Sequence, residues 1–225
     1  MIYHKYFTQE KAYSIKGSPS LFCFILPTEC RKKTIGIKLK LIKMEQLIQT
    51  TADKMIGKWE SIQGEERPNP WGGKYFLKRH FHNSKNEANT KLVFYTDGNF
   101  SDLNMTVEVI GPYHFIRPSA SVEGAVETDF EFTKVAVTPH NQAMVDMLNG
   151  IPSGYLKTWG VNTRQEVDTP GQGIMGIVIG EYKEYDLVKA EGDLLYYGAR
   201  PADGSAPDKA EKRASSLQVP LRKVQ

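Results

Sequence analysis

Apolar and polar residues alternate with a period of two over long stretches of this 225-residue sequence. Between Tyr75 and His82 most of the apolar side chains fall on one strand face and most of the polar ones on the other. Two later stretches repeat the pattern, with apolar faces formed by Leu103, Met105, Val107 and Val109, and by Val126, Phe130 and Phe132. Alternation of this kind predicts antiparallel strands with one buried and one solvated face.

Short apolar runs predict further strands. One apolar run covers residues 92–95 and ends at the turn sequence Asp97-Gly98-Asn99, and strands are also predicted at residues 174–179, 184–189 and 194–197. The order lacks a strand–helix–strand rhythm, and closure into a barrel is the usual way in which such a meander removes its edges. We therefore expect an all-β, antiparallel, calycin-like barrel of roughly eight to ten strands. Gly57-x-Trp59 resembles the opening of lipocalin and calycin barrels.

One short helix is predicted among the strands, over residues 139–149. Thr138 suits its N-cap and Pro139 its first helical position, where a missing N–H costs nothing. The helix ends at Asn149-Gly150, and its apolar stripe consists of Met144, Met147 and Leu148. A short amphipathic lead is also expected before the first strand, over residues 47–56. The tail, residues 200–225, is expected to be extended and to wrap the surface.

Residues 1–43 differ from the rest of the chain. They carry nine of the 29 Lys and Arg side chains but two of the 26 Asp and Glu side chains. They lack sustained patterning, so we interpret them as lying outside the barrel domain, which covers residues 44–225. They form either an accessory tail or an upstream extension with Met44 as the natural start. The alternative is a weak export signal. The longest apolar run, residues 21–26, is too short for a membrane helix, which needs about 20 residues.

The composition of the chain bears on its class of function and on its compartment. With 40% apolar and 24% charged residues the chain is typical of a folded, soluble protein, and residues 44–225 are mildly acidic. They contain no basic stripe for a phosphate backbone, so nucleic-acid binding is not expected. Both cysteines, Cys23 and Cys30, precede the barrel, so no disulfide braces it. We expect a cytoplasmic protein, or an exported one if residues 1–43 hold a signal.

Several longer strings of residues indicate a protein family more specifically than Gly57-x-Trp59 does. They include Glu184-Tyr185-Asp186-Leu187-Val188-Lys189-Ala190-Glu191 and Arg200-Pro201-Ala202-Asp203-Gly204-Ser205-Ala206-Pro207, and others lie at residues 57–61, 65–68, 76–81, 122–130, 137–149 and 211–221. With these strings, residues 55–223 resemble the β-barrel domain of the adenomatosis polyposis coli down-regulated (APCDD-type) family of Wnt inhibitors.

The resemblance implies a barrel with an apolar cavity that can house an acyl chain, such as the lipid carried by Wnt proteins. The sequence departs from the family where the family has cysteines, because these positions hold Gly64, Phe100, Ser153 and Gln172. The family's membrane anchor and second barrel are also not found. We therefore expect a single-barrel, cysteine-free relative, for which Wnt binding is not expected.

The candidate ligand pocket consists of inward-facing side chains. The alternative is a solid core, because eight-stranded barrels are often filled by side chains. Two methionines of the predicted helix are candidates for a deformable lid over the barrel mouth, or for plain helix packing. The candidate pocket residues are Trp59, Leu77, Phe81, Phe94, Met105, Val107, Phe130, Phe132, Met144 and Met147.

A polar cluster is predicted at the pocket. Glu65, Arg67 and Arg79 share strand parity with inward residues, and His80 follows them. Such a cluster could hold a ligand carboxylate or phosphate, or form a structural ion pair at one barrel end. His80 and His82 share a face with Lys78, which indicates solvated histidines and not a metal site. No metal, cofactor or phosphate-loop motif is found.

Three functions follow. The first is non-enzymatic binding or carriage of a lipid or other apolar small molecule, an acyl chain included, in a hydrophobic pocket. The second is an isomerase, cyclase or hydrolase that uses the same cavity, with its acid or base among Glu65, Glu127, His80 and Asp129. The third is a protein-interaction barrel with a filled core and an exposed apolar patch.

Overall fold

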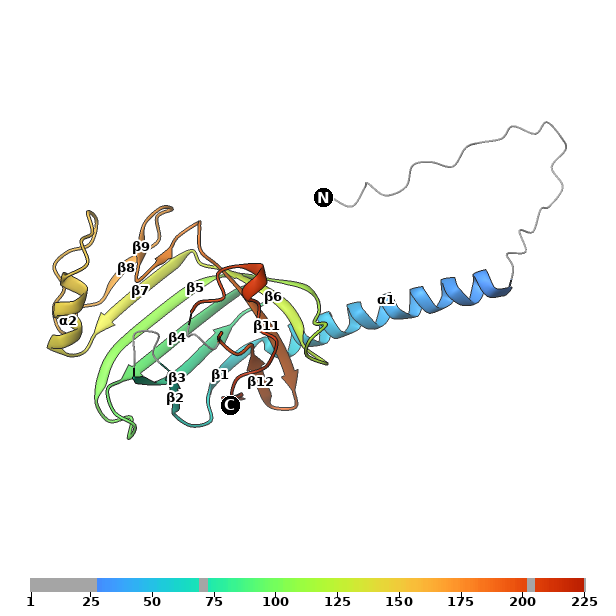
Figure 1. Ribbon diagram of the computed structural model, residues 1–225, viewed down its shortest axis with the longest axis horizontal. Helices are drawn as coiled ribbons and strands as arrows, with labels where there is room; N and C mark the ends of the chain where they lie inside the picture. Colours follow the sequence, from blue (N-terminus) through green and yellow to red (C-terminus); the bar gives the residue numbers. More distant parts are fainter. Residues whose placement is uncertain (1–27, 69–72, 202–204, 225) are drawn as a thin grey trace, which may run out of the picture. The chain divides into compact units, whose positions relative to one another are not determined.

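The computed structural model describes residues 28–68, 73–201 and 205–224 (Figure 1). The chain divides into two units, residues 1–39 and 40–225. The first helix, α1, covers Thr28–Met55 and is much longer than the expected amphipathic lead. Its last residue, Met55, is fully buried and its carbonyl accepts a hydrogen bond from Trp59 Nε1 at 2.8 Å. The apolar run at residues 21–26, and with it the export-signal alternative, lies outside the described residues.

A closed ring of eight antiparallel strands forms the barrel, which confirms the predicted all-β fold. Going round the ring, each strand pairs with the next and the last pairs with the first. The members in ring order are β1 (Gly57–Ser61), β3 (Lys74–Asn83), β4 (Glu87–Tyr95), β5 (Leu103–Pro118), β6 (Val126–Glu131), β11 (Lys183–Glu191), β12 (Leu194–Tyr197) and β13 (Leu221–Lys223).

The long strand β5 changes partner halfway along its length. Its first half pairs with β7 (Lys134–Pro139), which in turn pairs with β8 (Gln165–Val167), and its second half pairs with β6. Gly111 lies at the change, where a Cβ would be 1.9 Å from the carbonyl oxygen of Glu131. A side chain there would collide with the backbone, so glycine permits this crossing. Strands β7 and β8 thus extend beyond the ring (Figure 1).

Strand β3 pairs with β4 along one edge and with two different strands along the opposite edge. Its second half pairs with β1 and its first half with β2 (Glu65–Pro68). This pairing places Glu65 opposite Leu77 and Arg67 opposite Tyr75, so both charged side chains lie beside an inward-facing row.

The predicted helix start is wrong. The helix α2 covers Gln142–Asn149, and its N-cap is Asn141, whose side chain accepts a hydrogen bond from the Met144 amide at 2.9 Å. Thr138 and Pro139 belong instead to β7, where they pair with Thr106 and Met105. The sequence analysis predicted no strand here, and the pairing of β7 through Pro139 leaves the cap to Asn141.

Two other predicted segments also differ. Residues 174–179 form not one strand but a hairpin of β9 (Gly173–Ile174) and β10 (Ile177–Val178), because Met175 and Gly176 adopt φ angles of +54° and +82° and turn the chain. The tail does more than cover the surface. After a 3-10 turn at Ala210–Lys212 it contributes β13, which pairs with both β1 and β12 and closes the ring.

Candidate functional site

The interior of the barrel holds a partly open cavity of about 290 Å³. Six of the predicted pocket residues line it, from strands β3, β4, β5 and β6 and from Phe132 just beyond β6. Each points inward because the two-residue period of a strand alternates the faces. The six are Leu77, Phe81, Phe94, Val107, Phe130 and Phe132.

The other four predicted pocket residues lie elsewhere. Trp59 and Met105 are buried in the apolar core but do not line the cavity. Met144 is buried where α2 packs on the core, and Met147 on the same helix is 44% exposed. Neither methionine borders the barrel cavity, because α2 follows β7, which lies outside the ring.

Aromatic rings form part of the cavity wall. Phe81 stacks on Tyr197 with ring centroids 4.5 Å apart, and Phe130 lies at 5.9 Å from the same tyrosine. The Tyr197 hydroxyl accepts a hydrogen bond from Asn83 Nδ2 at 3.3 Å, and its burial raises the pKa of this phenol. Sequence reasoning missed Tyr197, although it stands two residues after the fully buried Leu195 on the same strand face.

A buried cluster of charges borders the cavity. The Glu65 carboxylate accepts one hydrogen bond from Arg79 Nε at 2.6 Å and another from Arg67 Nη2 at 2.5 Å. One carboxylate thus binds two guanidinium groups. Two tail residues complete the cluster, since Arg79 Nη2 donates to the Val219 carbonyl at 2.6 Å and Arg67 Nη2 donates to Gln218 Oε1. Arg67 and Arg79 line the cavity itself.

The electrostatics of this cluster follow from its burial. Burial alone raises the pKa of Glu65, but the charges and hydrogen bonds of Arg79 and Arg67 outweigh it and hold this pKa below its usual range. Burial lowers the pKa of Arg79, and Glu65 opposes that effect. The cluster therefore holds a charged carboxylate against two cations, which leaves it one positive charge in excess.

A second polar group on the cavity wall was not foreseen. Arg200 Nη1 lies 2.7 Å from Glu184 Oε1, and the Tyr182 hydroxyl donates to the same oxygen at 3.3 Å. Asp186 Oδ1 accepts the backbone N–H groups of Leu187 and Gly198, each at 2.7 Å. Burial, opposed by Arg200, raises the pKa of Asp186 to about 6. The available signal was strand parity, since Glu184 and Asp186 share a face with the buried Val188.

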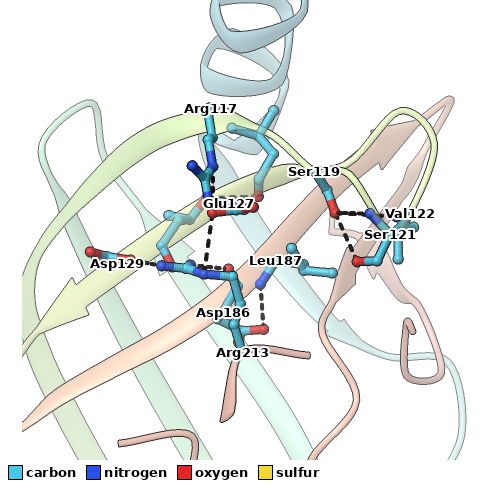
Figure 2. A network of polar contacts seen from close by, with 11 residues as sticks. Arg117, Ser119, Ser121, Val122, Glu127, Asp129, Asp186, Leu187 and Arg213 are labelled. Atoms are coloured by element: carbon cyan, nitrogen blue, oxygen red, sulfur yellow. Dashed lines mark hydrogen bonds and ion pairs between the residues drawn. The ribbon is translucent and has the colours of Figure 1, made fainter. Parts of the chain in front are cut away.

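The remaining candidate acids and bases lie on the outer face of the barrel. The His80 side chain is 43% exposed and lies 3.8 Å from Glu60; burial, Lys91 and Lys78 hold its pKa below the usual range, and Glu60 opposes them. Figure 2 shows that Glu127 and Asp129 instead meet Arg213 of the tail.

Arg213 fastens the tail to the outside of β6 and β11. It donates to Asp129 Oδ1 at 2.5 Å and to the backbone carbonyls of Thr128 and Asp186 at 3.2 and 2.8 Å (Figure 2). Glu127 lies 3.5 Å from Arg213 and also accepts Arg117 at 3.0 Å. These contacts are structural, because their side chains lie on the face of β6 that is opposite Phe130.

A second pocket, of about 520 Å³, lies outside the ring. It is lined mostly by apolar side chains from α2, residues 151–159 and the β9–β10 hairpin, and Met147 is one of them. Met175, at the hairpin turn, borders both this pocket and the barrel cavity. The hairpin therefore forms a wall common to the two spaces.

Two kinds of feature are absent from the described part of the chain. No three His, Cys, Asp or Glu side chains among residues 28–68, 73–201 and 205–224 are placed to hold a metal ion. Within the same ranges, no helix has both the length and the apolar character that crossing a bilayer requires.

Comparison with known protein families relates this chain to a described family. The family model described as "Adenomatosis polyposis coli down-regulated 1" matches residues 35–165. The matched region includes β1–β6 and the Glu65–Arg67–Arg79 cluster, and it ends before the Glu184–Arg200 pair.

Proposed function

Since this chain belongs to the adenomatosis polyposis coli down-regulated 1 family and its barrel holds a cavity, we propose that it binds or carries a lipid or other apolar small molecule there. The cavity carries this proposal, because a barrel of eight strands can be filled by its own side chains and this one is not. Its volume of about 290 Å³ lies at the small end of the range of ligand pockets, about 300–1,000 Å³. The ligand is therefore a compact molecule or a short chain.

The composition of the wall supports an apolar ligand with a polar end. Apolar side chains from β3, β4, β5 and β6 surround most of the space, and charged side chains gather at Glu65 and at Glu184. Pockets for small molecules commonly combine an apolar lining with a few fixed polar groups. Binding without turnover is favoured because three of the four acids or bases proposed from the sequence lie on the outer face. The fourth, Glu65, is bound by two arginines.

Fluorescence titration with N-phenyl-1-naphthylamine, a neutral apolar probe, tests the proposal on the full chain. We expect saturable binding that is weakened at least about tenfold by Val109→Trp, which fills the cavity from β5. Ile110→Trp is the matched control, because Ile110 is the next residue of the same strand and points outward.

Circular dichroism establishes that both variants fold, and Val109→Phe replaces Val109→Trp if the larger ring prevents folding. An absence of saturable probe binding to the wild-type chain would overturn the proposal. Equal binding by the Val109 and Ile110 variants would do so as well, because the probe would then bind outside the barrel.

A further inference from the structure

We propose that the ligand is an amphiphile with a single carboxylate, such as a fatty acid, whose head group binds the guanidinium pair of Arg67 and Arg79. This inference rests on the proposed function and names the chemical class of its ligand. The first observation behind it is the charge of the cluster. Two guanidinium groups share the carboxylate of Glu65, so at this pair one positive charge has no second carboxylate in direct contact among the described residues.

The second observation is an unsatisfied donor. Arg79 is only 3% exposed, and its Nε and Nη2 donate to Glu65 and Val219, but its Nη1 has no hydrogen-bond partner within the described ranges. A buried, charged donor without a partner is costly, and in folded proteins most such groups are paired. An oxygen acceptor beside Arg79 would supply what the cluster lacks.

The other carboxylates near the cavity already have partners. Glu184 is bonded to Arg200 and Tyr182, and Asp186 accepts two backbone N–H groups. Neither contacts Arg67 or Arg79 in the described interactions. The excess charge at the pair is thus not cancelled by a direct contact, and an incoming anion can supply the missing charge.

The side chains around Arg67 and Arg79 favour one class of anion over others. Leu77 and Phe81 flank Arg79 on the same face of β3, and Phe94 and Leu92 face the cavity from the neighbouring strand. An anion that binds the pair therefore lies next to apolar side chains, which suits a head group with an attached hydrocarbon chain. A carboxylate, with two oxygens and one charge, matches a single excess charge better than a phosphate does.

The test compares ligands of one chain length on the wild-type protein. Decanoic acid, methyl decanoate and decylamine are titrated against the bound neutral probe at pH 7.5. We expect the acid to displace the probe at least about tenfold more tightly than the ester, the ratio typical of a hydrogen bond to a charged group. The amine is expected to bind more weakly than the ester.

A variant of Arg67 tests whether the preference for the acid over the ester depends on the arginine pair. Arg67→Gln leaves one arginine for one glutamate, so it removes the excess charge without leaving Glu65 unpaired. We expect the acid and the ester to bind this variant within about threefold of each other, each compared with the variant's own affinity for the neutral probe. The control is Arg117→Gln on the outer face, where the arginine side chain is 67% exposed, and it should keep the full preference.

The outcomes of these titrations distinguish a failure of this inference from a failure of the proposed function. Probe binding with equal affinities for acid and ester, or an acid preference that survives Arg67→Gln, would overturn the inference and leave the proposed function standing. A failure of the probe, the acid and the ester to bind at all would overturn both. The wild-type comparison decides the question even if the variant does not fold.

Discussion

The ring of Phe100 occupies the space directly in front of Gly64. A Cβ on Gly64 would lie 2.0 Å from Phe100 Cζ, far inside van der Waals contact. The ring is also held by edge contacts with Tyr95 and Phe76, at centroid distances of 5.4 and 6.0 Å. Both positions are among those at which the resemblance to the family places cysteines, so an aromatic ring against a glycine stands where the family has thiols.

Gly64→Ala should destabilise the barrel because the new methyl group must displace the Phe100 ring from its aromatic neighbours. Overpacking of this kind costs about 1–3 kcal/mol of unfolding free energy. Urea unfolding measures it, with Gly154→Ala as the control, since a Cβ at Gly154 would meet no atom within 4 Å. Equal stabilities of the two variants would show that the ring moves without cost.

The double variant Gly64→Cys with Phe100→Cys should form a disulfide in oxidising buffer. The bond would close a loop of the unfolded chain, and such links typically stabilise by about 2–4 kcal/mol. The measurement compares urea unfolding of one sample before and after reduction, so that the loss of the phenyl ring affects both states equally. Thiols that remain titratable after oxidation would contradict the expectation.

Asp186 should make the barrel less stable as pH rises from about 4 to 6. In the unfolded chain its carboxyl titrates near 3.8, whereas burial raises the folded pKa to about 6. Between these values the folded state binds more protons, so a rising pH favours unfolding. The shift of roughly two pKa units corresponds to about 3 kcal/mol, lost progressively through this window.

The variant Asp186→Asn isolates this effect, because its side chain does not titrate. The difference in unfolding free energy between variant and wild type should grow in favour of the variant from pH 4 to pH 7. Asp193→Asn, on the exposed turn between β11 and β12, controls for removing a carboxylate from the chain. A difference independent of pH would mean that Asp186 is not the group that titrates.

Arg213→Met should cost about 2–3 kcal/mol, because it removes a partly buried guanidinium that holds two carboxylates and two backbone carbonyls (Figure 2). Arg117→Met should cost less than about 1 kcal/mol. Both arginines pair with Glu127, but the Arg117 side chain is 67% exposed and that of Arg213 is 13% exposed. Urea unfolding of the two variants checks the contrast, and equal losses would contradict it.

The inward faces of the strands could be predicted from the sequence because the two-residue period is local. Val107 and Phe130 line the cavity as their alternation indicates. The sequence analysis did not propose Glu184 and Asp186 as site residues, because charged side chains are mostly exposed. Partners distant in sequence, Arg200 and Gly198, allow them to face inward. A pattern along one strand does not report such partners.

Strand β13 could not be predicted from the sequence either, because its position also depends on partners distant in sequence. It has three residues, and of these only Leu221 is buried, so no periodicity marks it. Its place depends on pairing with β1, from the other end of the barrel sequence, and with β12. Gln218 and Val219, which complete the charged cluster, were missed for the same reason. They reach Arg67 and Arg79 only because the tail returns to the first strands.

Closure of the ring by β13 also has a consequence for biosynthesis. Strand β1 is the first strand of the ring to leave the ribosome, and its neighbour β13 is translated after all the other strands of the ring. Until residues 221–223 emerge, the nascent sheet has two open edges, which are sites of misassociation in partly folded chains. The strands around the cavity therefore form a complete ring only after these residues have been synthesised.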